Sequence, residues 1–267
     1  MKYKMLVLDL DDTLLTDDHK ISKLNKEMIL KVQQAGVHVV LASGRPTSAM
    51  TFYAKELEQD LSDSYMISYN GAQISRVKTG EIFFKQTLPI QQIHELYAFS
   101  KKNNTHIITY LNESIISETD SEYIEIEKKI TGLPHLKVPS FIDVVTTDAI
   151  KCILLEEPSY LKKIEKKLQN AMPHLSISMS KPFFLEVAQQ GIDKGNSLKL
   201  LAQELNIHSH EIIAIGNAGN DLSMIEYAGL GLWVANVTPE LRDKANAIVA
   251  SNNNDGVAEA IEKYILT

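Results

Sequence analysis

Short apolar runs recur along the chain, and polar residues follow each of them. The runs cover residues 5–8, 37–42, 65–68 and 212–215. Continuous apolar runs of this length are typical of strands that are buried on both faces of a parallel sheet. The pattern therefore predicts at least four such strands.

Segments near these runs show the apolar spacing of amphipathic helices. Ser22 suits the position before the first helix and Gly36 the position after it, with an apolar stripe made of Leu24, Met28, Val32 and Ala35. A second helix is expected from Lys194 onward, with a stripe made of Leu198, Leu201, Ala202 and Leu205. Buried strands that alternate with helices predict an α/β fold with a doubly wound parallel sheet.

The middle of the chain has a different pattern. Between residues 86 and 182, helical spacing alternates with strand-like runs at 106–110, 151–155 and 175–179, and none of these runs ends in clustered acids and glycines. Residues 183–187 are expected to lead back into the helix that begins near Lys194. We therefore predict a core domain of residues 1–85 and 183–267, with a second, α+β cap domain of residues 86–182 inserted into it.

Composition narrows the class of protein. The 267 residues are 44% apolar and 23% charged, which is ordinary for a soluble globular protein. The net charge of −7 argues against a nucleic-acid surface and leaves small anionic metabolites open as partners. Cys152 is the only cysteine and lies in an apolar run, so we expect a buried hydrophobic side chain.

The first apolar run is too short for a signal peptide or a membrane span, so a cytoplasmic location with no membrane partner is expected. The oligomeric state cannot be read from the sequence.

The candidate chemistry lies where the predicted strands end. Asp9, Ser43, Asn70 and Asn217 each stand at or just beyond such an end, and in parallel sheets the ligand crevice lies outside the carboxyl ends of the strands. Clustered acids at residues 9, 11 and 12 repel one another, which a bound cation offsets. A solvated acidic turn is the alternative interpretation.

Two further features indicate an anion site. Ser43 and Gly44 precede Pro46, so backbone N–H groups at a helix start can bind an anion there, although a plain N-cap explains Ser43 equally well. Lys194 stands in the first turn of a helix, where its charge is unfavourable by a few tenths to about 1 kcal/mol unless an anion is bound. Acids, anion donors and oxygen ligands for Mg²⁺ in one crevice predict phosphoryl transfer.

The motifs in order resemble those of the haloacid dehalogenase superfamily, specifically its Cof-type phosphatases. They are Asp-x-Asp-x-Thr from Asp9, Ser-Gly-Arg from Ser43, Asn-Gly-Ala from Asn70, Asp-Lys-Gly around Lys194 and Gly-x-x-x-Asn-Asp from Gly216. The resemblance implies a phosphatase for small phosphorylated metabolites such as sugar phosphates, with Mg²⁺ as cofactor and an aspartyl-phosphate intermediate. It also implies that the substrate enters between the core and the cap.

The same resemblance assigns a role to each matching residue. It makes Asp9 the nucleophile and Asp11 the general acid and base. Phosphate binding is assigned to Leu10 through its N–H, Ser43, Gly44, Lys194 and Asn220. Metal binding is assigned to Asp9, Asp11, Asn217 and Asp221. Arg45 and Asn70 are expected at the mouth of the site.

Two positions depart from the family pattern: Asp12, where many members have Gly, and Asn217, which bears on metal binding. Members usually have Asp where this chain has Asn217, and a neutral amide oxygen should bind Mg²⁺ more weakly than a carboxylate. A phospho-ligand sensor that has lost catalysis therefore stays open as an alternative. A phosphomutase, which uses the same aspartyl phosphate and returns the phosphoryl group to a second hydroxyl, is a second alternative. A Rossmann-type dehydrogenase is disfavoured because no Gly-x-Gly-x-x-Gly follows the first strand.

Overall fold

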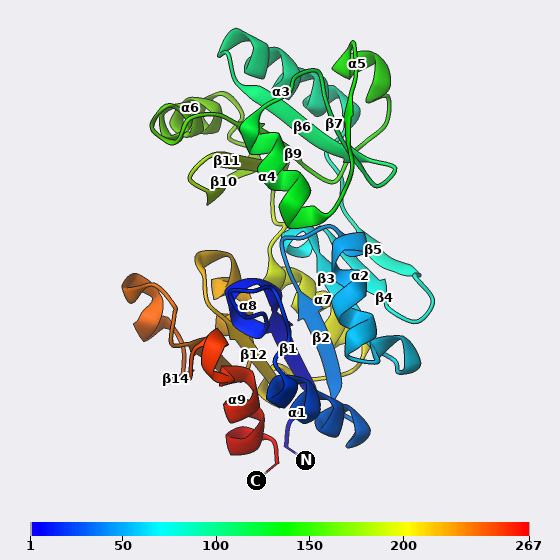
Figure 1. Ribbon diagram of the computed structural model, residues 1–267, viewed down its shortest axis with the longest axis vertical. Coiled ribbons are helices and arrows are strands. Elements are labelled where there is room, and N and C mark those ends of the chain that lie inside the picture. The colour runs from blue at the N-terminus through cyan, green and yellow to red at the C-terminus, as the bar shows by residue number, and fades with distance from the viewer. Residues whose placement is uncertain (1, 267) are drawn as a thin grey trace. The chain divides into compact units, whose positions relative to one another are not determined.

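The fold was analysed in a computed structural model that describes residues 2–266. The described chain divides into two compact units (Figure 1). The first runs up to Phe84 and resumes at Asp193, and the second is Lys85–Ile192. The chain thus leaves the first unit once and returns to it once.

The first unit is built on an eight-stranded sheet in the order β14-β13-β12-β1-β2-β3-β4-β5. Six strands form its parallel part: β1 (Met5–Asp9), β2 (His38–Ala42), β3 (Tyr65–Ser68), β12 (Ile212–Gly216), β13 (Leu230–Val234) and β14 (Ala247–Val249). At one side β4 (Gln73–Arg76) runs antiparallel to β3, and β5 (Ile82–Lys85) follows it in the sheet. The chain proceeds from β1 toward β3 and later returns to β12 on the other side of β1. The strand order therefore reverses between β1 and β12, where open parallel sheets form their ligand crevice.

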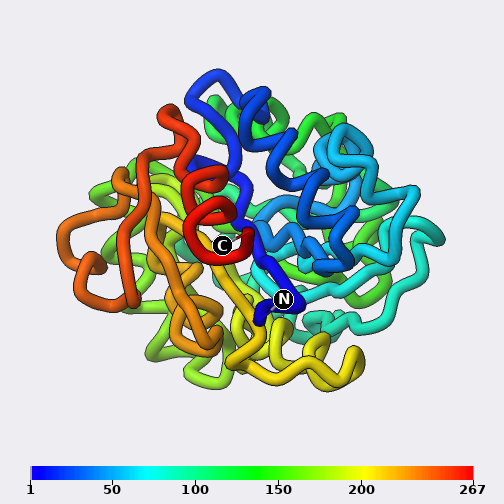
Figure 2. The backbone as a smooth tube through the Cα atoms, turned by 90° about the horizontal axis from the view of Figure 1, so that it is seen from below, coloured from blue at the N-terminus to red at the C-terminus, as the bar shows by residue number. Residues whose placement is uncertain are grey.

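Helices cover both faces of this sheet. On one face, Leu6 and Leu8 pack with residues of α1 (Lys23–Gln34), α2 (Thr47–Glu56) and α9 (Gly256–Tyr264). On the other, Met5 and Val7 pack with residues of α7 (Lys194–Glu204) and α8 (Leu222–Tyr227). Successive side chains of a strand point to opposite faces, which explains why the buried strands are apolar without interruption. Helix α9 lies beside α1 (Figure 2), so segments from both ends of the chain share one face.

The second unit contains a six-stranded sheet in the order β10-β11-β9-β6-β7-β8. Its strands are β6 (His106–Leu111), β7 (Ser114–Ser117), β8 (His135–Lys137), β9 (Cys152–Leu155), β10 (Leu175–Lys181) and β11 (Phe184–Gln189). Its helices are α3 (Ile90–Lys102), α4 (Glu122–Thr131), α5 (Phe141–Val144) and α6 (Pro158–Ala171). All strand pairs are antiparallel except β7 with β8. Cys152 is buried in this unit, as predicted.

The predicted end of the insertion at Pro182 requires a correction. Strand β11 pairs with β10 and β9 in the second sheet, and the second unit continues to Ile192. Three residues of β11 are buried in the second unit: Phe184, Leu185 and Val187. An apolar run of this length marks a strand but does not say which sheet it joins, and this is why the sequence placed it in the core. The one-residue difference at the start, Lys85 in place of residue 86, is minor.

Within residues 2–266, no helix is both long and apolar enough to span a membrane.

Candidate active site

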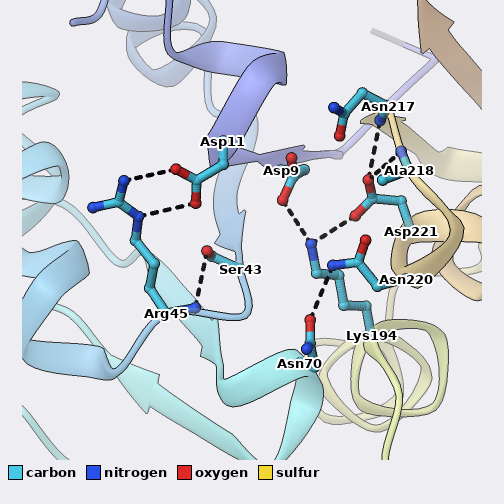
Figure 3. A network of polar contacts seen from close by, with 10 residues as sticks. All are labelled: Asp9, Asp11, Ser43, Arg45, Asn70, Lys194, Asn217, Ala218, Asn220 and Asp221. Carbon is cyan, nitrogen blue, oxygen red and sulfur yellow. Dashed lines mark hydrogen bonds and ion pairs between the residues drawn. The ribbon is translucent and has the colours of Figure 1, made fainter. Parts of the chain in front are cut away.

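The predicted site residues meet at the carboxyl edge of the parallel sheet. Asp9 is the last residue of β1, Ser43 follows β2, and Asn217 follows β12. Because β1 pairs with both β2 and β12, these ends are neighbours. Figure 3 shows them together with Lys194 and Asp11, in separate groups of polar contacts: Asp9 and Asn217 belong to the group around Lys194, and Ser43 belongs to the group around Arg45.

The buried ammonium group of Lys194 lies at the centre of one of these groups of contacts. Lys194 Nζ donates to Asp9 Oδ1 and to Asp221 Oδ1, at 2.6 Å in each case. The side chain of Lys194 is fully buried. Asp193 caps α7 by accepting the N–H of Asn196, so Lys194 is the first residue of the helix, as the sequence predicted. The lysine faces two carboxylates there, and these offset both its burial and its position at the positive end of the helix.

Asp221 is held from two sides. Its Oδ1 accepts from Lys194, and its Oδ2 accepts from the backbone N–H groups of Asn217 and Ala218, at 3.0 and 3.1 Å. The residue is fully buried. It also lies against Gly216, where a Cβ atom would come within 2.6 Å of the Asp221 side chain. Both carboxylate oxygens thus have protein partners, and the metal-ligand role expected of Asp221 stays a prediction.

Asp11 belongs to a second group of contacts, and Asp9 lies between it and Lys194 (Figure 3). The chain turns after β1, with Asp12 at a φ of 56°, and the Asp11 carboxylate meets Arg45. Arg45 Nε donates to Asp11 Oδ2 at 2.9 Å, and Arg45 Nη2 donates to Oδ1 at 2.6 Å. Such two-point ion pairs fix both the position and the plane of a carboxylate. Arg45 was expected at the mouth of the site, and its partner here is Asp11.

The loop after β2 is built around Ser43. The hydroxyl oxygen of Ser43 accepts the N–H of Arg45 at 3.1 Å, and its carbonyl accepts the N–H of Asn70 at 3.0 Å. Helix α2 begins only at Thr47, after Pro46, so the plain N-cap interpretation of Ser43 is wrong. A Cβ on Gly44 would lie 3.1 Å from Asn70 Oδ1, an atom that accepts from Asn220 Nδ2 at 3.0 Å. The predicted phosphate ligands of this loop and Asn220 are therefore close neighbours.

Burial and charge shift the acid–base properties of these groups. Burial raises the pKa of Asp9 from 3.8 to about 7, and the charge of Asp221 adds to the shift while Lys194 opposes it. Burial would lower the pKa of Lys194, but Asp221 and Asp9 outweigh it and the pKa rises above its ordinary value. Burial would also raise the pKa of Asp11, yet the hydrogen bonds and charge of Arg45 reverse this and lower it. Lys194 is therefore cationic and Asp11 ionised at neutral pH.

The donor set fits a hard divalent cation. The Asp9 carboxylate and the Asn217 amide stand at the ends of adjacent strands, and both offer oxygen atoms. Among residues 2–266, no three His, Cys, Asp or Glu side chains are grouped to hold a metal ion. Mg²⁺ does not need such a group, because proteins usually bind it through one or two carboxylates together with water and substrate phosphate.

Two residues near the site, Tyr53 and Asn236, were not predicted from the sequence. The ring of Tyr53 in α2 lies 5.4 Å from the guanidinium carbon of Arg45. Asn236 Nδ2 donates to the carbonyl of Asp12 at 2.7 Å and so holds the turn after β1. Neither residue belongs to a motif, and each reaches the site only because its segment packs there.

The fold and the site together define the class of protein. Residues 6–261 match the family described as haloacid dehalogenase-like hydrolase, and the chain therefore belongs to that family. The predicted resemblance is confirmed, and so is the predicted class of enzyme, a hydrolase.

Three similar proteins illustrate the match. YxeH of Bacillus subtilis, provisionally named a phosphatase, is 33% identical over 270 residues, which cover 99% of each chain. The 5-amino-6-(5-phospho-D-ribitylamino)uracil phosphatase YcsE of the same organism is 29% identical over 264 residues, covering 98% of this chain and 96% of that one. The crystal structure of a haloacid dehalogenase-like hydrolase from Bacteroides thetaiotaomicron superimposes with a TM-score of 0.92 at 34% identity, covering 98% of this chain and 99% of that one. The predicted fold class is confirmed by this likeness.

Proposed function

We propose that this chain is a phosphatase that hydrolyses small phosphorylated metabolites through a covalent aspartyl phosphate on Asp9. The observation that carries the proposal is the buried Lys194, whose Nζ lies 2.6 Å from Asp9 Oδ1. A cation beside a carboxylate at a ligand crevice attracts a phosphate dianion and neutralises the charge that otherwise repels the attacking oxygen. This contact supports the assignment of Asp9 as the group that attacks phosphorus.

The reaction divides into two half-reactions. In the first, an Asp9 oxygen forms a bond to phosphorus while the bond from phosphorus to the substrate oxygen breaks. Asp11 enters this step in its protonated form, with substrate bound, and gives that proton to the departing oxygen. In the second, a water oxygen attacks phosphorus and passes a proton to Asp11. The bond from phosphorus to Asp9 then breaks, inorganic phosphate forms, and the Asp9 carboxylate is restored. Neither carboxylate is consumed over the cycle.

The remaining residues bind the phosphoryl group. We assign this role to the N–H groups of Leu10 and Gly44, the hydroxyl of Ser43, the ammonium of Lys194 and the amide of Asn220. Asn70 holds Asn220 through the 3.0 Å hydrogen bond and lies beside Gly44. We assign Asp221 the task of anchoring Lys194 and the loop after β12, because its two oxygens already serve these partners.

Mg²⁺ is the cofactor that we propose. Its ligands on this chain would be the carboxylate of Asp9, the amide oxygen of Asn217 and the backbone carbonyl of Asp11. When bound, the ion would polarise the phosphoryl oxygens and help to orient the substrate. Asn217 supplies no negative charge, so we expect weak binding of the ion.

The substrate class rests on the family and on its relatives. The name of YcsE states that it acts on a phosphorylated ribitylamino compound, and its match to this chain is nearly full-length. We therefore propose small phosphomonoesters, sugar phosphates among them, as substrates. A cytoplasmic location, with no nucleic-acid or membrane partner, is proposed on the grounds of the net charge of −7 and the apolar pattern of the chain.

Asn217 keeps one alternative open, a sensor that binds a phosphorylated ligand without turning it over. The test is phosphate release from a panel of phosphorylated metabolites across a Mg²⁺ titration, in the native protein, in Asp9→Asn and in Asn217→Asp. We expect release that needs both Mg²⁺ and Asp9. Calorimetry should show Mg²⁺ binding about tenfold or more tighter in Asn217→Asp, because the change adds one negative charge.

Other outcomes point elsewhere. Isomerised product without release of inorganic phosphate would identify a phosphomutase. Activity that appears only in Asn217→Asp would favour the sensor and contradict the phosphatase proposal.

A further inference from the structure

The two half-reactions do not involve the ion pair between Arg45 and Asp11. Its guanidinium makes two hydrogen bonds to the carboxylate, at 2.9 and 2.6 Å. The side chain of Arg45 is 9% exposed, whereas that of Asp11 is 39% exposed. The arginine is thus the more deeply buried member of the pair.

Several contacts from different segments fix Arg45. Its N–H donates to Ser43 Oγ at 3.1 Å, and its carbonyl accepts the N–H of Tyr69 at 2.9 Å. Its guanidinium lies over the ring of Tyr53 at 5.4 Å, where aromatic faces attract cations. A planar guanidinium held in this way presents a fixed fork to a carboxylate.

Asp11 has little other support. It stands in extended backbone, with a φ of −70° and a ψ of 127°, and Asp12 follows at a φ of 56°. Both oxygens of its carboxylate are engaged by Arg45, one by Nε and the other by Nη2. Two hydrogen bonds of this kind set both the position and the plane of the carboxylate.

We propose that Arg45 is a positioning residue for the second half-reaction: it holds Asp11 in the orientation from which Asp11 accepts the proton of the attacking water. The inference rests on the proposed function, because it presumes the aspartyl phosphate on Asp9. It gives Arg45 a task distinct from binding substrate at the mouth of the site. A small misplacement of a reacting group lowers a rate by up to about 100-fold, so loss of the two-point pair should slow hydrolysis of the phospho-enzyme.

The test uses p-nitrophenyl phosphate with Mg²⁺ and the full chain. Its leaving group departs without a proton, so the first half-reaction does not need Asp11. Arg45→Lys keeps the positive charge but cannot make both hydrogen bonds to the Asp11 carboxylate. In this variant we expect kcat to fall roughly 10- to 100-fold. KM should fall in parallel, so that kcat/KM changes by less than about threefold, because a slower second step lowers both constants together.

A second readout follows the intermediate directly. A burst of p-nitrophenol should precede the steady state in Arg45→Lys, and acid-quenched protein should carry one added phosphoryl group by intact mass, which Asp9→Asn abolishes. Arg45→Gln, which keeps a single hydrogen bond to Asp11, should show the same burst and the same phospho-enzyme as Arg45→Lys. It replaces the lysine variant in the test if that variant does not fold. Arg76→Lys is the matched control, since Arg76 is a half-exposed arginine that pairs with Asp63 and Glu81; it should match the native protein.

The possible failures are distinct. A lower kcat/KM with a higher KM and no accumulated phospho-enzyme would show that Arg45 binds substrate or supports the fold, and would overturn the positioning role. If the native protein releases no p-nitrophenol, or if Asp9→Asn retains the native rate, the proposed function itself fails and the inference fails with it.

Discussion

Lys194 is buried between two acids, Asp9 and Asp221, and supplies the cation that both of them contact. Replacing Lys194 by Met would leave Asp9 and Asp221 buried without a cation. Breaking a buried pair in this way typically costs about 3–5 kcal/mol. We predict a loss of this size in the free energy of unfolding at pH 7, measured by urea denaturation.

The matched control for this prediction lies on the same helix. Lys199 is exposed on α7, so Lys199→Met should change stability by less than about 0.5 kcal/mol. The deficit of Lys194→Met should also shrink as the pH is lowered. The pKa of Asp9 is already raised by burial, and without Lys194 nothing lowers it, so Asp9 binds a proton in the folded state before it does so in the unfolded chain, which stabilises the folded variant in acid. A deficit independent of pH would contradict the electrostatic explanation.

Shape is as restrictive as charge at Gly216. A Cβ there would lie 2.6–2.7 Å from three side-chain atoms of Asp221, closer than real contacts allow. Gly216→Ala should therefore displace Asp221 from Lys194, destabilise the protein by about 1–3 kcal/mol and reduce phosphate release. Gly219, three residues on, has no atom within 4 Å of the same position. Gly219→Ala is the control and should leave the melting temperature and the activity near native values.

At the scale of elements, Glu118 joins three segments of the second unit. It accepts the hydroxyl of Tyr97 at 2.7 Å and Lys101 Nζ at 3.0 Å, both from α3, and the N–H of Phe141 at 2.7 Å, at the start of α5. Burial alone would raise its pKa, but these hydrogen bonds outweigh it and lower the pKa below the ordinary 4.5. A lowered pKa means that the carboxylate stabilises the fold above pH 4.5 and that this stability is lost as the pH falls through the lower, folded value.

Glu118→Gln removes that titration. We predict that the variant is less stable than the native protein at pH 7 by roughly 1.5–3 kcal/mol, and that the difference disappears in acid. Urea denaturation at a series of pH values from 7 downward measures it. Glu125→Gln is the control, because Glu125 makes an exposed pair with Lys128 on α4 and should contribute little. A difference that persisted in acid would mean that Gln lacks something other than charge.

Helix α1 shows why element faces are hard to place from spacing. The stripe expected from Leu24, Met28 and Val32 is only partly the buried face, because Leu24 is 47% exposed. Asn25 is buried instead, and its Oδ1 accepts the N–H of Ala258 in α9. A polar side chain thus lies on the buried face because a distant helix supplies its partner, which no local pattern reveals.

At the scale of the whole molecule, the insertion should be an independent folding unit. Residues 85–192 contain a complete six-stranded sheet and a core of their own. We predict that this fragment, expressed alone, unfolds cooperatively in urea with native-like circular dichroism. The fragment 86–182 is the control and should not fold, because it lacks β11, the partner of both β10 and β9. Folding of the shorter fragment would place the boundary back at Pro182.

The sequence by itself determined the chemistry that this protein has available. Continuous apolar runs predicted buried parallel strands, and the polar residues that end them predicted where Asp9, Ser43 and Asn217 would gather. These inferences hold because the alternation of strands and helices permits few arrangements, and because the carboxyl ends of parallel strands meet at one edge. The position of Lys194 at a helix start could also be predicted from the sequence, because helix capping depends on neighbouring residues of the chain.

Only the tertiary structure decided which of these groups are partners. Lys194 and Asp9 are 185 positions apart, and Asp11 and Arg45 are 34 apart. The sequence placed Arg45 at the mouth of the site and residues 183–187 in the core, whereas Arg45 pairs with Asp11 and β11 joins the second sheet. Spacing along a chain specifies local conformation and the face of a strand, whereas partnership depends on which distant segments pack together, and no local pattern encodes that.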